Sequence, residues 1–365
     1  MSKQASQISV EALSTLLRDH PETLRFPGAM LMSYGPENYV GAVIAITGTL
    51  YFQGGHTTER RQAIAECFDA YKDLAGRNLK WLWREEAPSG PPCQPYNKAS
   101  PLREMFNKLD EDDLLNFHYT SGIKRDDASM YTSFVNAPRG WKARKGEKLS
   151  VLRFSLPYLD IVEHPRRFQE MFVDFARLLD AEHGHGGFGF VLSSSKWDQD
   201  QPTEAFVARR VAGLDIGEPT FMASALTPDT FKTVGWLTAI NERMVEAAGG
   251  INALRSELPP AWFAFYDYGN GIVIQAGNEP DIATKELDDK PPIYVLPNAA
   301  LRSLRSPEQW LHIDNLSKDP PRLTGAAGDA WMQRFDVPDE ALLDVKAKLL
   351  DWPKLTPAHT LDSAR

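Results

Sequence analysis

The sequence predicts an α+β fold built from two similar strand–helix–strand lobes, with mainly antiparallel sheets and with helices packed on one face. Short runs rich in β-branched and aromatic residues alternate with amphipathic helical stretches over 365 residues, more than the roughly 100–150 residues of one domain. The order strand, helix, strand also recurs at a constant spacing. The corresponding positions are Ile44 and Val151, Thr58 and Pro165, and Trp81 and Phe188. We expect an N-terminal lobe over 1–145, a C-terminal lobe over 146–352 and a loosely held tail over 353–365.

The first lobe should open with a short helix over Ser9–Arg18 and a long strand over Val40–Phe52. That apolar run is too short to span a bilayer. A helix should follow with Thr58 as its N-cap, because its apolar residues recur at helical spacing up to Leu74. In the next strand Leu79, Trp81 and Trp83 alternate with Lys80, Leu82 and Arg84, which predicts a buried face that carries the tryptophans. A proline-rich loop over Pro88–Pro101 and strands over Phe117–Ile123 and Met130–Val135 complete the lobe.

The second lobe shows the clearest patterns in the chain. A strand carries Leu152 to Tyr158, and a helix begun by Pro165 places Phe168, Phe172 and Phe175 on one stripe. The elements expected after it are a strand over Gly187–Ser194, a helix over Pro202–Val211, a helix over Trp236–Leu258 interrupted by Gly249-Gly250, and a last helix over Pro338–Leu350. Between them, Trp262–Tyr268 and Ile272–Ala276 flank an Asn-Gly pair, which predicts a hairpin with a type I′ turn.

The charge balance and the motif inventory exclude several classes of function. A net charge of −9 and a pI near 5.5 argue against direct nucleic-acid binding. One basic stretch surrounds Trp141, and we interpret it as a solvated linker; its residues are Arg139, Lys142, Arg144, Lys145 and Lys148. Two cysteines without metal-type spacing and the lack of an export signal favour a cytoplasmic protein that contacts no membrane. No GxSxG, HExxH, Walker or GxGxxG motif follows a predicted strand, so we expect no catalytic site and no cofactor.

Two histidines form the most chemical-looking string, His183-Gly184-His185-Gly186-Gly187. We expect an exposed, glycine-rich connection from helix to strand, because two histidines alone supply only two metal ligands. The alternative is a metal-dependent hydrolase that uses His183, His185 and a carboxylate from Glu182 or Asp180. A small-molecule site in an aromatic pocket between the lobes is a third, weaker reading.

Three segments in the second half resemble a known family in their order and spacing. They are Gly235-Trp236-Leu237-Thr238, then Gly249-Gly250 with Leu254-Arg255, then Gly271-Ile272-Val273-Ile274-Gln275-Ala276-Gly277 with Pro280. Together with Phe52–Tyr71 and Phe188-Gly189-Phe190, they resemble the type VI immunity family TsiV over about Val40–Leu304. One departure is Asp281-Ile282-Ala283-Thr284, where the resemblance leads us to expect Gly-Asp-like residues.

The resemblance implies a protein that binds and neutralises a cognate type VI secretion toxin, a nuclease, by occluding its active site. Acidic side chains are then candidates for the contact, because carboxylates placed where DNA phosphates would lie attract a basic nuclease cleft. The candidate partner-binding residues are Asp110, Glu111, Asp112, Asp113, Glu279, Asp281, Glu286, Asp288 and Asp289. Solvated surface is the competing interpretation of these acids, and the sequence leaves the oligomeric state open.

Overall fold

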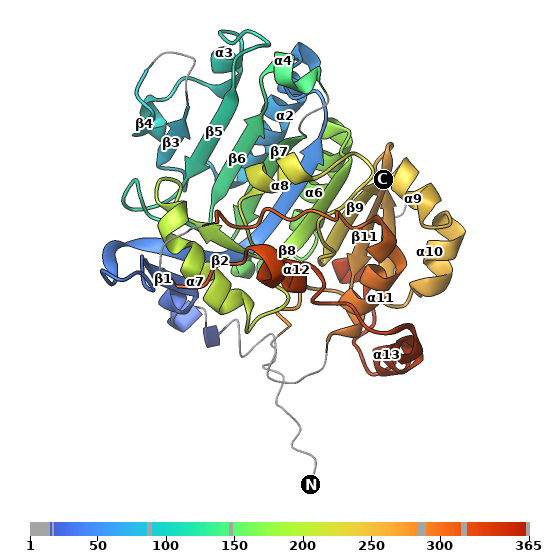
Figure 1. Cartoon of the computed structure of the whole chain (residues 1–365). Helices are drawn as coiled ribbons and strands as arrows, with labels where there is room; N and C mark the ends of the chain where they lie inside the picture. The colour runs from blue at the N-terminus through green and yellow to red at the C-terminus, as the bar shows by residue number, and fades with distance from the viewer. Residues whose placement is uncertain are drawn as a thin grey trace.

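The computed structural model of the chain describes residues 15–16, 18–85, 90–145, 149–283, 290–314 and 320–362. Its strands form one sheet in the order β10-β11-β9-β8-β2-β7-β6-β5-β3-β4, and β1 pairs with β2 outside this path. Every ladder between named strands in the described part of the chain is antiparallel. The predicted α+β class is therefore confirmed (Figure 1).

The strands are β1 Arg25–Gly28, β2 Glu37–Phe52, β3 Trp81–Arg84, β4 Cys93–Pro95, β5 Leu115–Thr120, β6 Thr132–Ala137, β7 Ser150–Leu156, β8 His183–Leu192, β9 Leu237–Asn241, β10 Phe263–Asp267 and β11 Gly271–Ala276. The α-helices are α2 Thr58–Ala75, α3 Leu102–Phe106, α4 Gly140–Ala143, α5 Tyr158–Glu163, α6 Arg167–Leu179, α7 Trp197–Ala208, α8 Pro219–Ala225, α9 Glu242–Ala247, α10 Ile251–Glu257, α11 Pro292–Leu301, α12 Gly325–Met332 and α13 Leu342–Leu349. Short 3₁₀ turns are η1 Pro21–Leu24, η2 Tyr96–Lys98, η4 Arg302–Leu304, η5 Asp339–Ala341 and η6 Pro357–His359.

Helices cover both faces of the middle of the sheet, whereas the sequence predicted one covered face. On one face, the Phe154 ring of β7 packs against Phe168 and Phe175 of α6, with ring centroids 5.2 and 5.0 Å apart. The neighbouring side chain, Arg153, points to the opposite face and reaches Asp215 in the loop before α8. In Figure 1, α8 and α12 lie in front of the sheet, and α2 and α6 lie behind it. Two covered faces explain why β2 is buried without alternation from Ala42 to Phe52.

The two strand–helix–strand units exist, and α2 contacts α6 on the same face. Their strands are placed differently, however. In the second unit only β2 lies between β7 and β8, whereas in the first unit β7, β6 and β5 separate β3 from β2. One continuous sheet crosses the predicted boundary at residue 146, through the β6–β7 and β2–β7 ladders. The division into two lobes stays a prediction.

The buried face of β3 is the reverse of the predicted one. Leu82 is fully buried, and Arg84 points into the core toward the Met105 sulfur. Trp81 and Trp83 lie half-buried on the other face and donate their indole N–H groups to the carbonyls of Gly122 and Arg125. Both sets of side chains contain apolar residues, so the alternation alone could not select the core-facing set.

The segment that follows Gly235 is a strand and two short helices, where the sequence predicted one interrupted helix. Leu237–Asn241 forms β9 and pairs with both β8 and β11, which is a tertiary environment that local periodicity cannot report. Asn241 then caps α9 by accepting the N–H of Met244 at 2.9 Å.

The predicted hairpin is confirmed as β10 and β11, but the φ of +100° at Gly269 makes Gly269-Asn270 a type II′ turn.

The C-terminal tail is held against the sheet as far as Asp362, contrary to the sequence expectation. Gln275 Nε2 donates to the carbonyl of His359 at 2.9 Å, and the N–H of Leu361 donates to the Tyr266 hydroxyl at 3.2 Å. Leu361 is buried. At the other end of the chain, most of the predicted helix over Ser9–Arg18 lies outside the described residues. None of the helices in the described ranges is long and apolar enough to cross a membrane.

Candidate partner-binding site

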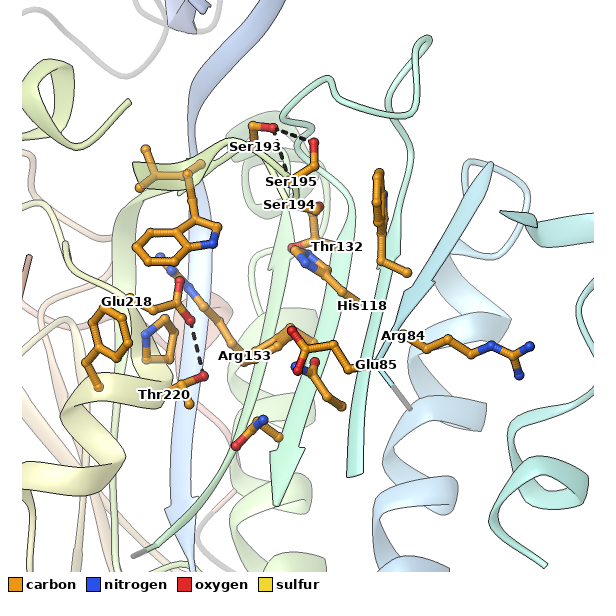
Figure 2. A pocket seen from close by; sticks show the side chains of 18 of the residues that line it. Arg84, Glu85, His118, Thr132, Arg153, Ser193, Ser194, Ser195, Glu218 and Thr220 are labelled. Carbon is orange, nitrogen blue, oxygen red and sulfur yellow. Dashed lines mark hydrogen bonds between the residues drawn. The ribbon is translucent and has the colours of Figure 1, made fainter. Parts of the chain in front are cut away.

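A cleft of about 810 Å³ opens on the part of the sheet that helices leave uncovered. Its floor consists of alternate side chains of β3, β5, β6 and β7, and Figure 2 shows these side chains with the wall beside them. Burial alternates along β5 and β6, in contrast to β2, because one face of these strands lacks a covering helix. The half-buried members of the floor are Trp83, Asn116, His118, Phe134 and Asn136.

The strand register brings the floor residues together in rows. Asn116 lies opposite Asn136, and His118 lies opposite Phe134 with its ring edge-on at a centroid distance of 5.3 Å. Phe134 in turn faces Arg153 of β7. The floor is therefore a mixed surface of aromatic rings and side-chain amides with one guanidinium at its inner end.

Arg153 sets the electrostatics of the inner end of the cleft. Its Nη2 donates to the carbonyl of Phe190 at 3.1 Å and lies 3.7 Å from Asp215 Oδ2. Burial, with a smaller contribution from Arg153, lowers the pKa of His118 to about 3. Burial also raises the pKa of Glu218, and Arg153 opposes that increase. His118 is therefore neutral at physiological pH, and the negative charge of Glu218 is disfavoured.

The wall of the cleft comes from the loop after β8 and from the first residues of α7 and α8. Ser193, Ser194 and Ser195 form its outer part, and the rings of Trp197 and Phe221 meet edge-on at 5.5 Å. Deeper in the wall lies a fixed buried pair. Glu204 accepts from His312 Nε2 at 2.7 Å, while His312 Nδ1 accepts the N–H of Leu323 at 3.0 Å, which fixes the Nε2–H tautomer.

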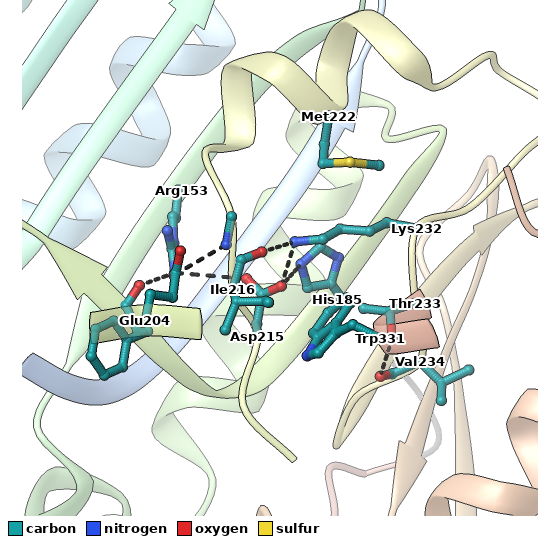
Figure 3. Close-up of polar contacts among 12 residues, drawn as sticks. Arg153, His185, Glu204, Asp215, Ile216, Met222, Lys232, Thr233, Val234 and Trp331 are labelled. Carbon is teal, nitrogen blue, oxygen red and sulfur yellow. Dashed lines mark hydrogen bonds and ion pairs between the residues drawn. The ribbon is translucent and has the colours of Figure 1, made fainter. Parts of the chain in front are cut away.

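Behind this wall lies a buried ion cluster centred on Asp215 (Figure 3). Lys232 Nζ donates to Asp215 Oδ1 at 2.6 Å, and His185 Nε2 lies 3.0 Å from the same oxygen. Although burial opposes it, the proximity of His185, Lys232 and Arg153 holds the pKa of Asp215 well below its usual range. Burial lowers the pKa of Lys232, and Asp215 opposes that decrease.

The two histidines singled out in the sequence lie inside β8, and the expectation of an exposed turn was wrong. His183 and His185 are 0% and 1% exposed. Both ring nitrogens of His183 are occupied, since Nδ1 lies 2.9 Å from the carbonyl of Ala239 and Nε2 accepts the N–H of Lys232. This pattern requires the neutral Nδ1–H tautomer, and burial lowers the pKa of His183 well below its usual value.

The carboxylates of the metal hypothesis are engaged elsewhere. Glu182 accepts from Gln53, from Asn241 Nδ2 at 2.6 Å and from Arg243 Nη2 at 3.1 Å. Asp180 lies 3.5 Å from Arg60. Within the described ranges, no group of three or more His, Cys, Asp and Glu side chains is arranged to hold a metal ion. His183 and His185 therefore do not form the metal site of the alternative hypothesis with either carboxylate.

The first predicted acidic cluster lies in the loop between α3 and β5, against α4. Asp110, Glu111 and Asp112 are exposed, and Asp113 is half-buried. Arg144, at the end of α4, lies 2.7 Å from Asp112 Oδ1 and 3.5 Å from Glu111 Oε2. The acidic loop and the basic stretch around Trp141 thus form one paired unit beside the cleft.

The remaining predicted acidic residues are not brought to that loop. Glu279 follows β11, toward the other edge of the sheet from β5, and it accepts the Tyr158 hydroxyl at 2.9 Å. The Asp281 carboxylate accepts the N–H of Ala283. The Tyr294 hydroxyl accepts the N–H of Asp281 and donates to its carbonyl. Both side chains are partly buried and have local partners. Glu286, Asp288 and Asp289 lie outside the described residues.

Sequence reasoning missed the cleft and the position of α4 at its mouth. Arg139 and Lys142 of this unit line the cleft, and Trp141 is 42% exposed. The signal was present in Trp141 with Arg139 and Arg144, because tryptophan and arginine are enriched at protein contact surfaces. No sequence pattern could show which strands this segment meets.

Comparisons with known proteins agree with this architecture. A family model described as TsiV, type VI immunity for VRR-NUC, matches residues 63–335. A solved structure, the Pseudomonas aeruginosa T6SS protein PA0821, is 43% identical to this chain and superposes with a TM-score of 0.89. The match covers 96% of this chain and 98% of PA0821. Among curated proteins, none matches. The family match and the fold shared with this T6SS protein place the chain in a type VI immunity class of protein. The chain belongs to the TsiV family, which confirms the resemblance drawn from its motifs.

Proposed function

We propose that this protein binds a cognate type VI effector toxin, a nuclease, in the cytoplasm and neutralises it by covering its active site. The observation that supports this function best is membership of the TsiV family, together with a fold shared over nearly the whole chain with a T6SS protein. A broad cleft that opens on a sheet, with exposed side chains at its rim, is a suitable shape for a protein contact.

Long-range attraction is the role that we propose for the exposed acids. The net charge of −9 attracts a basic nuclease, and Asp110, Glu111 and Asp112 place part of that charge beside the cleft. Charges of this kind raise the association rate more than the affinity. Glu279 and Asp281 contribute less in this proposal, because local hydrogen bonds already hold them.

The first experiment is co-expression with the product of the neighbouring gene in a host that this product kills. We expect restored growth and a stable complex on affinity capture. The control is the toxin with its active-site residues replaced: it should still be captured but should not affect growth. If the active toxin kills cells that contain the soluble protein and no complex forms, the proposed function is wrong.

Occlusion makes a separate prediction about the toxin. In a cleavage assay with purified toxin and labelled DNA, one equivalent of this protein should abolish cleavage and should also prevent DNA from binding to the inactive toxin. Full DNA binding within a stable ternary complex would contradict occlusion and leave the binding role intact.

A further inference from the structure

Helix α4 presents an exposed aromatic ring close to two cations. Trp141 is 42% exposed, and the ammonium groups of Lys142 and Lys145 each lie 5.3 Å from its ring centroid. A ring in this arrangement is stabilised by cation–π attraction while one edge stays open to a partner. Tryptophan is also among the residues that contribute most to protein–protein contacts.

The acidic loop holds α4 in place at the mouth of the cleft. The N–H of Gly140 donates to the carbonyl of Glu111 at 2.9 Å, and Arg144 pairs with Asp112. The carboxylates of the loop thereby balance the positive charge of Arg144. Within the described part of the chain, Lys142 and Lys145 form no ion pair, so their charges are available to a partner.

The inner end of the cleft carries a further cation, which is paired with a carboxylate. Arg153 brings a guanidinium to the floor, and its Nε has no partner among the described residues. Its Nη2 lies 3.7 Å from Asp215 Oδ2, and Glu85, Glu204 and Glu218 also line the cleft, so the charge of Arg153 is balanced at this end. A largely acidic protein therefore presents a local surface that is positive at α4, through Lys142 and Lys145, and aromatic where it continues into the cleft.

We propose that this surface, made of Trp141, Lys142, Lys145, Phe134 and Arg153, is the close-contact site for a carboxylate-bearing segment of the toxin. The proposal rests on the proposed function and names the face of this protein that performs it. Long-range attraction by the net negative charge and close contact through a positive patch are compatible, because the net charge acts on the rate of encounter whereas the groups that touch fix the register of the complex. The occupant is a protein segment, since a net charge of −9 opposes the binding of nucleic acid.

The test uses the full-length protein and a catalytically inactive form of the cognate toxin, with the dissociation constant measured by calorimetry. Trp141→Ala should weaken binding by roughly tenfold or more, as removal of an exposed contact tryptophan does. Lys142→Glu should weaken it at least as much, and Lys142→Arg should retain affinity. The matched control is Trp310→Ala, which removes a tryptophan that is 49% exposed in another segment; it should bind like the wild type.

Three outcomes overturn the inference in distinguishable ways. If the wild type binds and protects while Trp141→Ala and Lys142→Glu bind equally well, the contact lies elsewhere and the proposed function stands. If the wild type does not bind the toxin at all, both proposals fail. If a labelled single-stranded 20-mer binds the free protein and Trp141→Ala abolishes that binding, the surface recognises nucleic acid. Circular dichroism of each variant confirms that loss of binding is not loss of fold.

Discussion

At the scale of single residues, the buried cluster around Asp215 combines ion pairing with a high cost of disruption. Its carboxylate faces Lys232, His185 and Arg153, and its surroundings exclude water. A buried charge that loses its partner is far more costly than an exposed one. Asp215 also joins the loop before α8 to the sheet, because its N–H donates to the carbonyl of Phe188.

Asp215→Asn should therefore lower the free energy of unfolding by about 3–5 kcal/mol, because it leaves Lys232 buried without its counter-charge. Urea denaturation followed by tryptophan fluorescence measures the change. Asp112→Asn is the control, since it removes an exposed pair with Arg144 and should cost at most about 1 kcal/mol. Equal, small losses for both variants would show that the cluster is not important for stability.

The free energy of unfolding should change with pH because of the raised pKa of Asp200. This carboxyl accepts from the N–H of Ala29 and from the Tyr39 hydroxyl, yet burial raises its pKa to about 6. The folded protein then binds a proton more tightly than the unfolded chain, whose Asp has a pKa of about 3.9. From pH 4 to 6 this group alone should reduce the free energy of unfolding by roughly 2–3 kcal/mol as pH rises.

Asp200→Asn should remove that slope. The comparison is urea denaturation of the wild type and the variant at pH 4.5, 5.5 and 6.5. Asp215 contributes in the opposite sense, since its lowered pKa gives stability that is present above about pH 4 and lost only in stronger acid. Parallel pH profiles for wild type and Asp200→Asn would show that the Asp200 carboxyl titrates normally.

At the scale of elements, strong periodicity was a reliable guide and glycine was a misleading one. The phenylalanine stripe predicted α6, and the apolar run predicted β2. The sequence predicts a loop at Gly184 and Gly186, but the glycines of β8 provide room in the sheet: a Cβ at Gly184 would lie 2.4 Å from Leu50 Cδ2, and one at Gly189, which was predicted as strand, would lie 2.2 Å from Thr47 Oγ1. Only the tertiary packing distinguishes such close approach from a turn.

The tail offers a test at the same scale. Leu361 is 7% exposed, so Leu361→Ala should lower the free energy of unfolding by about 2–3 kcal/mol through lost burial and a residual cavity. Leu350→Ala is a suitable control at 69% exposure and should change it by about 0.5 kcal/mol at most. Thermal unfolding followed by circular dichroism compares the two. An unchanged Leu361→Ala variant would mean that the tail is loosely held in solution.

At the scale of the whole molecule, the fold class and the family could be predicted from the sequence, and the candidate site could not. The cleft takes Trp83, Phe134 and Arg153 from three strands that are distant in the chain, and α4 reaches its mouth only because the acidic loop holds it there. Motifs that shape the fold, such as the Gly271–Ala276 strand, identify the family without locating this surface.

Net charge acts at the same scale and yields a kinetic prediction. If the negative charge attracts the toxin, Asp110→Lys should lower the association rate constant several-fold at low salt, with little change in the dissociation rate. Glu340→Lys makes the same change in net charge on an exposed residue of η5 and should have a smaller effect, because it lies outside the unit beside the cleft. Stopped-flow mixing at two salt concentrations separates the rates. Faster association of Asp110→Lys would show that the approaching surface of the toxin is acidic, whereas equal slowing by both variants would assign the attraction to net charge alone.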